Sequence, residues 1–187
     1  MIRNYRDLTR LEMEQVNKDE TIVLIPLGAL EQHGNQAPLG TDDIIAEAMT
    51  DYIRRELEGE PSSEDSDFPM LVFPVIPVGL STEHRNFCGS ITLKPDTYYH
   101  MLYDISTSLV HHGFKKLAFL VCHGGNAPIV QVLSRELRSE FGISPFILSS
   151  GAFSHPDVTA TIQKEISGTS MEARWKPPWS WPWTRPW

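Results

Sequence analysis

The chain has 187 residues, 41% of them hydrophobic, and its 24 acidic and 16 basic side chains give a formal net charge of -8. This length and hydrophobic content suit one compact domain with a substantial core. The negative charge and the lack of a basic run argue against nucleic acid or an anionic membrane surface as the main partner, and favour a small molecule.

Apolar periodicity alternates between strand and helix patterns along the chain. Helices are expected over residues 7–16, 43–57 and 95–111 and in a segment that ends at 141, and strands over 22–26, 71–77, 90–93, 117–122 and 146–150. An acidic connector over residues 58–67 has no apolar periodicity. The alternation predicts a three-layer αβα fold of the α/β class, in which helices cover both faces of a mainly parallel sheet.

Four side chains of the types that bind metal ions lie near the expected ends of strands and helices: Glu31, His33, Asp42 and His123. Carboxylate oxygens and neutral imidazole nitrogens bind zinc, manganese or ferrous iron, and a carboxylate can bridge two ions. Residues two apart in an extended segment point to the same side, so Glu31 and His33 can converge. His123 ends an apolar strand and precedes a glycine turn, which is where open α/β sheets hold their active sites.

Each of these residues also has a structural interpretation. Asp42 lies where a helix is expected to begin, and an aspartate there is more often an N-cap than a ligand. A single Glu-x-His pair such as Glu31 and His33 arises easily by chance. The four residues together indicate a metal site more strongly, because two strand ends would bring them to one edge of the sheet.

The chain resembles the creatininase family of amidohydrolases through four motifs in fixed order. They are Gly-Ala-Leu-Glu-Gln-His-Gly (28–34), Leu-Gly-Thr-Asp (39–42), Glu-His-Arg-Asn-Phe-Cys-Gly-Ser-Ile (83–91) and His-Gly-Gly-Asn (123–126). The resemblance extends from about Leu8 to about Ala152. It implies the same α/β fold and a metal-dependent hydrolase of non-peptide C–N bonds, such as those of a small cyclic amide or a formamide.

The resemblance also assigns roles to individual residues. It implies that Asp42 bridges two divalent ions (zinc, manganese or iron), that Glu31 and His123 bind one of them and that His33 binds the other. A bridging hydroxide would then attack the substrate carbonyl. His84 is expected to orient substrate or assist proton transfer, although a surface histidine without a role is the alternative. The expected substrate-facing loops contain Glu83, Gly124, Gly125 and Asn126.

The end of the chain departs from the family pattern. Family members continue through a His-(Ala/Gly)-Gly-Glu-x-Glu-Thr-Ser motif, whose glutamate completes the ligands of the second ion. Here a Pro- and Trp-rich stretch holds all five tryptophans. Back-translation of residues 171–187 with permitted codons can spell Gly-Gly-Glu-Met-Glu-Thr-Ser in a shifted frame, and a Ser170 codon that ends in C supplies the preceding His. We therefore expect a frameshift or truncation near Ser170, with an incomplete creatininase-like domain over 1–160 and a disordered tail over 161–187.

Two functional alternatives follow. The first is an active amidohydrolase with two ions; the second is a catalytically impaired remnant that binds one ion weakly because the C-terminal glutamate ligand is absent. Creatinine itself is disfavoured as substrate, since creatininases carry an acidic residue where this chain has Gly125. The family forms hexamers, which the altered end of this chain puts in question. No apolar stretch approaches the roughly 20 residues of a membrane span, so a cytoplasmic protein is expected.

Overall fold

The structure, a computed structural model, describes residues 2–59 and 69–150. Within them, five parallel strands form one sheet in the order β1-β3-β2-β4-β5. The strands are β1 (Ile2–Asn4), β2 (Ile22–Leu27), β3 (Met70–Val72), β4 (Lys116–Val121) and β5 (Phe146–Ser149). The expected parallel sheet is therefore confirmed.

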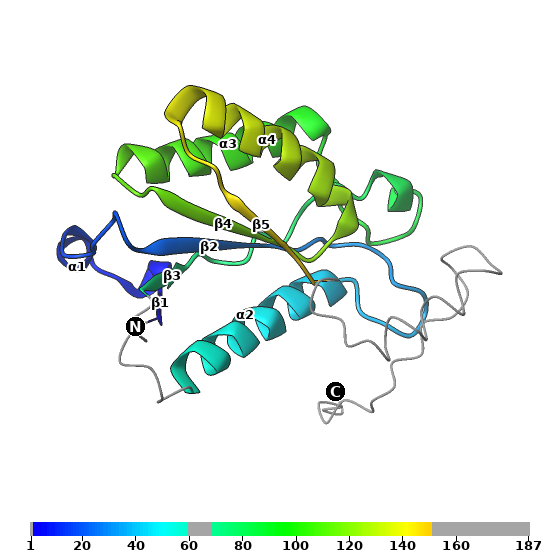
Figure 1. The fold of residues 1–187 in the computed structure, drawn as a ribbon. Helices are drawn as coiled ribbons and strands as arrows, with labels where there is room; N and C mark the ends of the chain where they lie inside the picture. The colour runs from blue at the N-terminus through cyan, green and yellow to red at the C-terminus, as the bar shows by residue number, and fades with distance from the viewer. Residues whose placement is uncertain (1, 60–68, 151–187) are drawn as a thin grey trace. The chain divides into compact units, whose positions relative to one another are not determined.

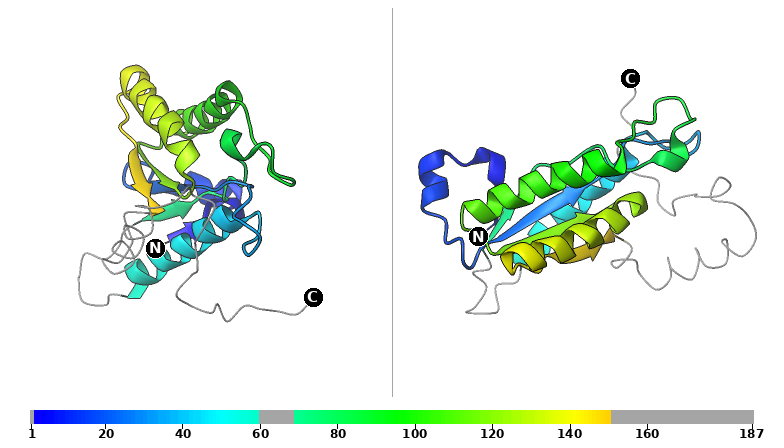
Figure 2. Two further views of the ribbon diagram at one scale, coloured as in Figure 1. Left: turned by 90° about the vertical axis from the view of Figure 1, so that its right-hand side faces the viewer. Right: turned by 90° about the horizontal axis from the view of Figure 1, so that it is seen from above.

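Helices cover both faces of the sheet, which gives the expected three layers. In Figures 1 and 2, α3 (Pro95–His111) and α4 (Ala127–Phe141) lie together on one face, and α2 (Thr41–Gly59) lies on the other. A short α1 (Arg10–Glu14) and three 3-10 turns, η1 (Tyr5–Asp7), η2 (Thr82–His84) and η3 (Gly124–Asn126), complete the described elements.

The core is divided between the two faces of the sheet because side chains alternate along each strand. On β2, Val23, Ile25 and Leu27 pack toward one cluster, together with buried residues of α3 and α4. Leu24 points the other way and joins Ala46 of α2 in a second cluster. Both central strands, β2 and β4, are buried almost throughout, which holds their carboxyl ends in a fixed position.

Several element boundaries differ from the prediction. The strand expected over 71–77 stops at Val72, since Pro74 and Pro77 cannot donate to a strand ladder. The helix expected over 7–16 is shorter in the structure: a capping box between Thr9 and Glu12 fixes its start at Arg10, and it ends at Glu14.

The prediction was also wrong for two short segments at the margins of the sheet. The strand expected over 90–93 is a single bridge between Leu30 and Ile91, because Leu93 pairs with the loop residue Gly79 instead. β1 was missed, since three residues are too few to show a period.

Some expectations fall outside the described residues. They are the domain boundary at 160, the tail over 161–187 with its shifted reading frame, and most of the acidic connector. Among the helices that the structure describes, none has the length and apolar character needed to cross a bilayer.

Candidate metal centre

Glu31 and His123 reach one place from the carboxyl ends of neighbouring strands. Glu31 follows β2, and its loop is fixed by a hydrogen bond from the Glu31 N–H to the Leu39 carbonyl (3.0 Å) and by the bridge between Leu30 and Ile91. His123 follows β4, which pairs with β2 in parallel register. The pairing of the two central strands therefore brings the two side chains together.

Asp42 joins this pair from the first turn of α2. Its side chain is buried and faces the two histidines of the site: Oδ1 lies 3.3 Å from Nε2 of His33, and Oδ2 lies 3.2 Å from Nδ1 of His123. The two carboxylate oxygens are thus divided between two imidazoles. This arrangement favours the ligand interpretation of Asp42 over the N-cap interpretation.

Glu31, Asp42 and His123 form a buried group in which one donor atom from each residue lies within 4.8 Å of the others. Oε2 of Glu31 lies 3.4 Å from Nε2 of His123. His33 stands at the open side of the group and is about a quarter exposed (26%), with Nε2 3.9 Å from Oε1 of Glu31. All four residues proposed as ligands from the sequence therefore meet at one site.

In both His33 and His123, the ring nitrogen that faces away from Asp42 lies against a backbone carbonyl. Nδ1 of His33 lies 3.2 Å from the Glu31 carbonyl, and Nε2 of His123 lies 2.6 Å from the Leu80 carbonyl. A carbonyl only accepts, so these nitrogens carry the protons of the neutral rings. Their other nitrogens then present lone pairs to the oxygens of Asp42.

Lone pairs facing carboxylate oxygens at this distance require a positive charge between them. Buried Oε2 of Glu31 and Oδ2 of Asp42 have no hydrogen-bond partner among the described residues, which is a costly state for a buried charge. A divalent cation fits this donor set, since it accepts oxygen and imidazole ligands at once. The buried group therefore fits the metal that the sequence predicts.

Without a cation, protons take its place. Burial lowers the pKa of His123, but hydrogen bonds to Asp42 and to the Leu80 carbonyl outweigh it and raise the pKa to about 9. The hydrogen bond to Asp42 raises the pKa of His33. Burial opposes ionisation of Asp42, yet the two histidines hold its pKa below the usual value. The site therefore retains positive charge in either state.

The ring of His123 is held by a chain of buried contacts. The amide of Asn126 donates to the Gly28 carbonyl (2.9 Å) and accepts from the Leu80 N–H (2.9 Å). Leu80 in turn accepts from His123 through its carbonyl. Outer contacts of this kind fix the tautomer and orientation of a ligand histidine. Sequence reasoning missed Leu80, since an apolar side chain gives no signal of a functional carbonyl.

The residues expected in substrate-facing loops differ in their surroundings. Glu83 and Gly124 are exposed, whereas Asn126 is fully buried. A Cβ atom at Gly125 would lie 2.1 Å from the Leu80 carbonyl, so this position admits no side chain without a shift of the backbone. Asn126 and Gly125 therefore shape the site from within, and their contact with substrate stays a prediction.

His84 lies beside the buried group. Its Nε2 is 3.5 Å from Oε1 of Glu31, and its Nδ1 is 2.7 Å from the side-chain amide nitrogen of Gln32. Gln32 was not among the residues expected at the site, although its place between Glu31 and His33 inside the motif was an available signal.

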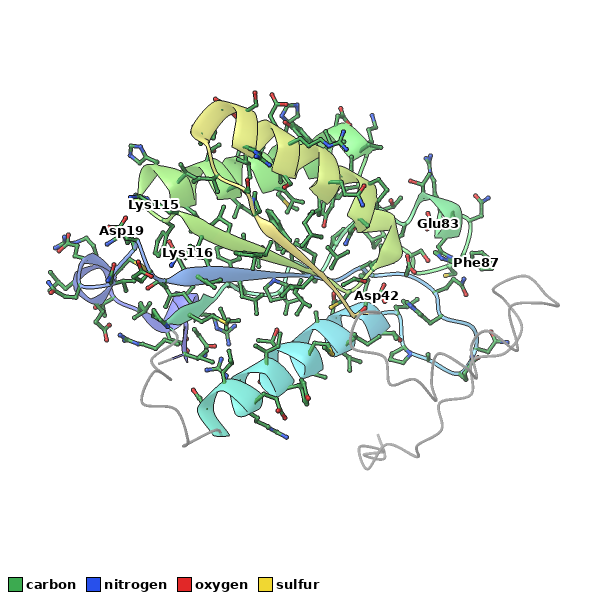
Figure 3. All side chains as sticks on the ribbon, viewed as in Figure 1. Asp19, Asp42, Glu83, Phe87, Lys115 and Lys116 are labelled. Carbon is green, nitrogen blue, oxygen red and sulfur yellow. The ribbon has the colours of Figure 1, made fainter. Side chains whose placement is uncertain are left out.

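The other charged contacts lie elsewhere. Figure 3 shows Asp42 on the same side of the molecule as Glu83 and Phe87, while Asp19, Lys115 and Lys116 gather at the opposite end. There, Lys115 pairs with Asp19 at 2.6 Å, and both side chains are largely exposed. Exposed pairs of this type contribute little free energy. Among the described residues, the group that could hold a metal ion lies at the carboxyl ends of the strands.

Curated proteins with related sequences are known. The "Mycofactocin precursor peptide peptidase" of Mycobacterium ulcerans is 33% identical over 118 residues, which cover 63% of this chain and 46% of that protein. The "Creatinine amidohydrolase" of Pseudomonas putida is 25% identical over 142 residues, covering 71% and 50%. The chain thus spans about half the length of the curated relatives that it matches.

Solved structures show the same fold. A tryptophan-to-phenylalanine variant of creatininase superposes with a TM-score of 0.67 at 24% identity, covering 86% of this chain and 64% of that one. The structure described as "Putative creatinine amidohydrolase from Bacteroides fragilis NCTC 9343" gives a TM-score of 0.61 at 26% identity, covering 78% of this chain and 54% of that one. A glutamate-to-glutamine variant of creatininase is described as Zn-Zn type.

The sequence pattern that defines the creatininase (creatinine amidohydrolase) family matches residues 6–177 of this chain. This range includes all four motifs and both strand ends that meet at the candidate metal centre. The chain therefore belongs to the creatininase family.

Proposed function

We propose that this protein is a metal-dependent amidohydrolase that cleaves a C–N bond of a small cyclic amide or a formamide. The observation that carries the proposal is the division of the Asp42 carboxylate between two imidazole lone pairs, at 3.3 and 3.2 Å. One carboxylate between two ligand histidines is the arrangement expected of a bridge between two cations.

The chain supplies distinct groups for this chemistry. Glu31, Asp42 and His123 would hold one ion in the buried group, and Asp42 and His33 would hold the other at the more exposed side. When bound, zinc, manganese or iron would polarise the amide carbonyl and lower the pKa of water. His84 is placed to orient substrate or assist proton transfer, since Nε2 lies next to Glu31.

The substrate class is narrowed by Gly125. The Leu80 carbonyl occupies the space that a side chain at this position would need. The acidic group that creatininases carry here is therefore absent, and its place is closed. This supports an amide other than creatinine.

A peptide amide is a second candidate substrate. It is favoured by the 33% identity to the mycofactocin precursor peptide peptidase of M. ulcerans. Glu83 and Phe87, which flank His84 in the chain, have exposed side chains that are available to contact a larger substrate.

The alternative to an active enzyme is a catalytically impaired remnant that binds one metal ion weakly and hydrolyses no substrate. An assay of amide hydrolysis by protein loaded with a defined metal distinguishes the active enzyme from the remnant. The full chain, stripped with chelator and reloaded with zinc or manganese, is assayed against formamides, cyclic amides and short peptides. The proposal expects hydrolysis that chelator abolishes and metal restores, and that Asp42→Asn lowers about hundredfold or more. Asp51→Asn, an exposed aspartate of the same helix, serves as the matched control.

Three results would contradict the proposal. Hydrolysis that survives chelation would exclude the metal mechanism. A chain that binds two ions and hydrolyses none of these amides would exclude the substrate class, and one weakly bound ion without turnover would identify the remnant.

A further inference from the structure

Gln32 lies between two ligands of the candidate metal centre, but its side chain turns to a different partner. Its amide nitrogen lies 2.7 Å from Nδ1 of His84, a residue far away in the sequence. Its amide oxygen accepts the backbone N–H of Gly34 at 2.9 Å. Gln32 is therefore held at both ends of its amide.

The contact to Gly34 decides which way the amide of Gln32 faces. A backbone N–H can only donate, so it requires the amide oxygen and leaves the NH2 group toward His84. An amide NH2 can only donate, so Nδ1 of His84 must accept. The proton of the neutral His84 ring is then on Nε2.

This tautomer makes His84 different from the two ligand histidines. His33 and His123 each place a backbone carbonyl behind the ring and present a lone pair to the carboxylates. His84 has a donor behind the ring and presents an N–H to Oε1 of Glu31, 3.5 Å away. An imidazole N–H cannot bind a cation, so His84 acts as a donor in this site.

The N–H of His84 affects which oxygen of Glu31 remains available. Oε1 of Glu31 faces His84, while the buried Oε2 faces His123 and has no hydrogen-bond partner among the described residues. We propose that Gln32 is a positioning residue: it sets the tautomer of His84, whose Nε2–H holds Oε1 of Glu31 and leaves Oε2 to bind the metal. The inference rests on the proposed metal-dependent function.

Replacement of Gln32 by glutamate tests this directly. A carboxylate at this position can still accept the Gly34 N–H, but it cannot donate to Nδ1, so the proton of His84 moves to Nδ1. The lone pair on Nε2 then faces the Glu31 carboxylate, and zinc affinity falls by about 10- to 100-fold, the usual effect of an outer partner of a ligand. Gln32→Met, which neither donates nor accepts, gives a mixed tautomer and an intermediate loss.

The tautomer is read from the ring nitrogen resonances of the full chain labelled with 15N histidine, in mildly alkaline buffer, with and without zinc. His84→Asn assigns the signal. The expected result is protonated Nε2 in the wild type and protonated Nδ1 in Gln32→Glu. Gln36→Glu, an exposed glutamine of the same loop, controls for the added charge and keeps both the tautomer and the zinc affinity.

The proposal is overturned if His84 carries its proton on Nδ1 in the wild type, if Gln32→Glu keeps the wild-type tautomer, or if Gln36→Glu lowers zinc affinity equally. If Gln32→Glu does not fold, the tautomer of His84 in the wild type and the zinc affinity of Gln32→Met still test the proposal. A wild type that shows the expected tautomers but binds no zinc refutes the proposed function instead, so the two failures are distinguishable.

Discussion

The histidines of this site are distinguished by what lies behind each ring. Carbonyl groups behind His33 and His123 leave lone pairs toward Asp42, and the amide of Gln32 behind His84 leaves an N–H toward Glu31. Residue type and spacing in the sequence indicated the ligands. They could not indicate the tautomers, because these depend on backbone groups that only the folded chain brings near.

Removal of His33 is predicted to affect only one of two ions. His33 is the ligand at the open side, while Glu31, Asp42 and His123 form the buried group. His33→Ala should therefore lower zinc stoichiometry from two ions to one and leave the tighter ion in place. Equilibrium dialysis with metal analysis measures this, with His112→Ala, an exposed histidine, as control. Loss of both ions at once would contradict separate sites.

The stability of the metal-free protein is predicted to fall with rising pH. The pKa of His123 is raised from 6.5 to about 9, so its stabilising interaction with Asp42 is complete below pH 6.5 and is lost as pH rises through about 9. Urea unfolding in the presence of chelator, followed across this range, should show the decrease, and His123→Gln should make it smaller, leaving the part that comes from the raised pKa of His33.

Zinc affinity should rise as the pH increases from 6.5 to about 9, because the metal must displace the proton of His123 and this proton is lost over that range. A zinc affinity that falls between pH 6.5 and 9, or a metal-free stability that rises there through His123, would contradict this account.

At the scale of elements, the glycine turn of η3 is fitted closely to the loop that contains Leu80. A Cβ atom at Gly125 would lie 2.1 Å from the Leu80 carbonyl and 2.5 Å from Nε2 of His123, whereas one at Gly124 would meet nothing within 4 Å. Two adjacent glycines therefore offer a matched pair of substitutions.

Gly125→Ala is predicted to destabilise the fold by about 1–3 kcal/mol, the usual cost of overpacking, and to weaken zinc binding through His123. Gly124→Ala should change the free energy of unfolding by less than about 0.5 kcal/mol. Chemical denaturation and zinc titration of both variants test the difference. Equal behaviour of the two would show that Leu80 does not constrain the turn.

The main elements were predictable because their patterns are strong. Helix α3 has the predicted bounds, and β2 and β4 are within a residue or two of theirs, since long apolar periods and flanking turn residues define them. The strand over 71–77 was overextended because Pro74 and Pro77 were given too little weight. β1 could not be predicted, since its three residues become a strand only by pairing with β3.

At the scale of the molecule, the parallel sheet explains why distant motifs make one site. β2 and β4 are neighbours in the sheet although far apart in sequence, and both carboxyl ends lie at the same edge. The loop before α2 returns to this edge, so the first turn of α2 supplies Asp42. The chain spans about half of its curated relatives, yet this half holds all four expected ligands.

Zinc binding by the full chain tests the central claim most directly. We predict that the wild type and Asp51→Asn bind zinc equally in equilibrium dialysis, and that Asp42→Asn binds it at least about a hundredfold more weakly, because Asp42 faces both ligand histidines. Equal zinc binding by Asp42→Asn and the wild type, with both variants folded, would contradict the assignment of this site as the metal centre.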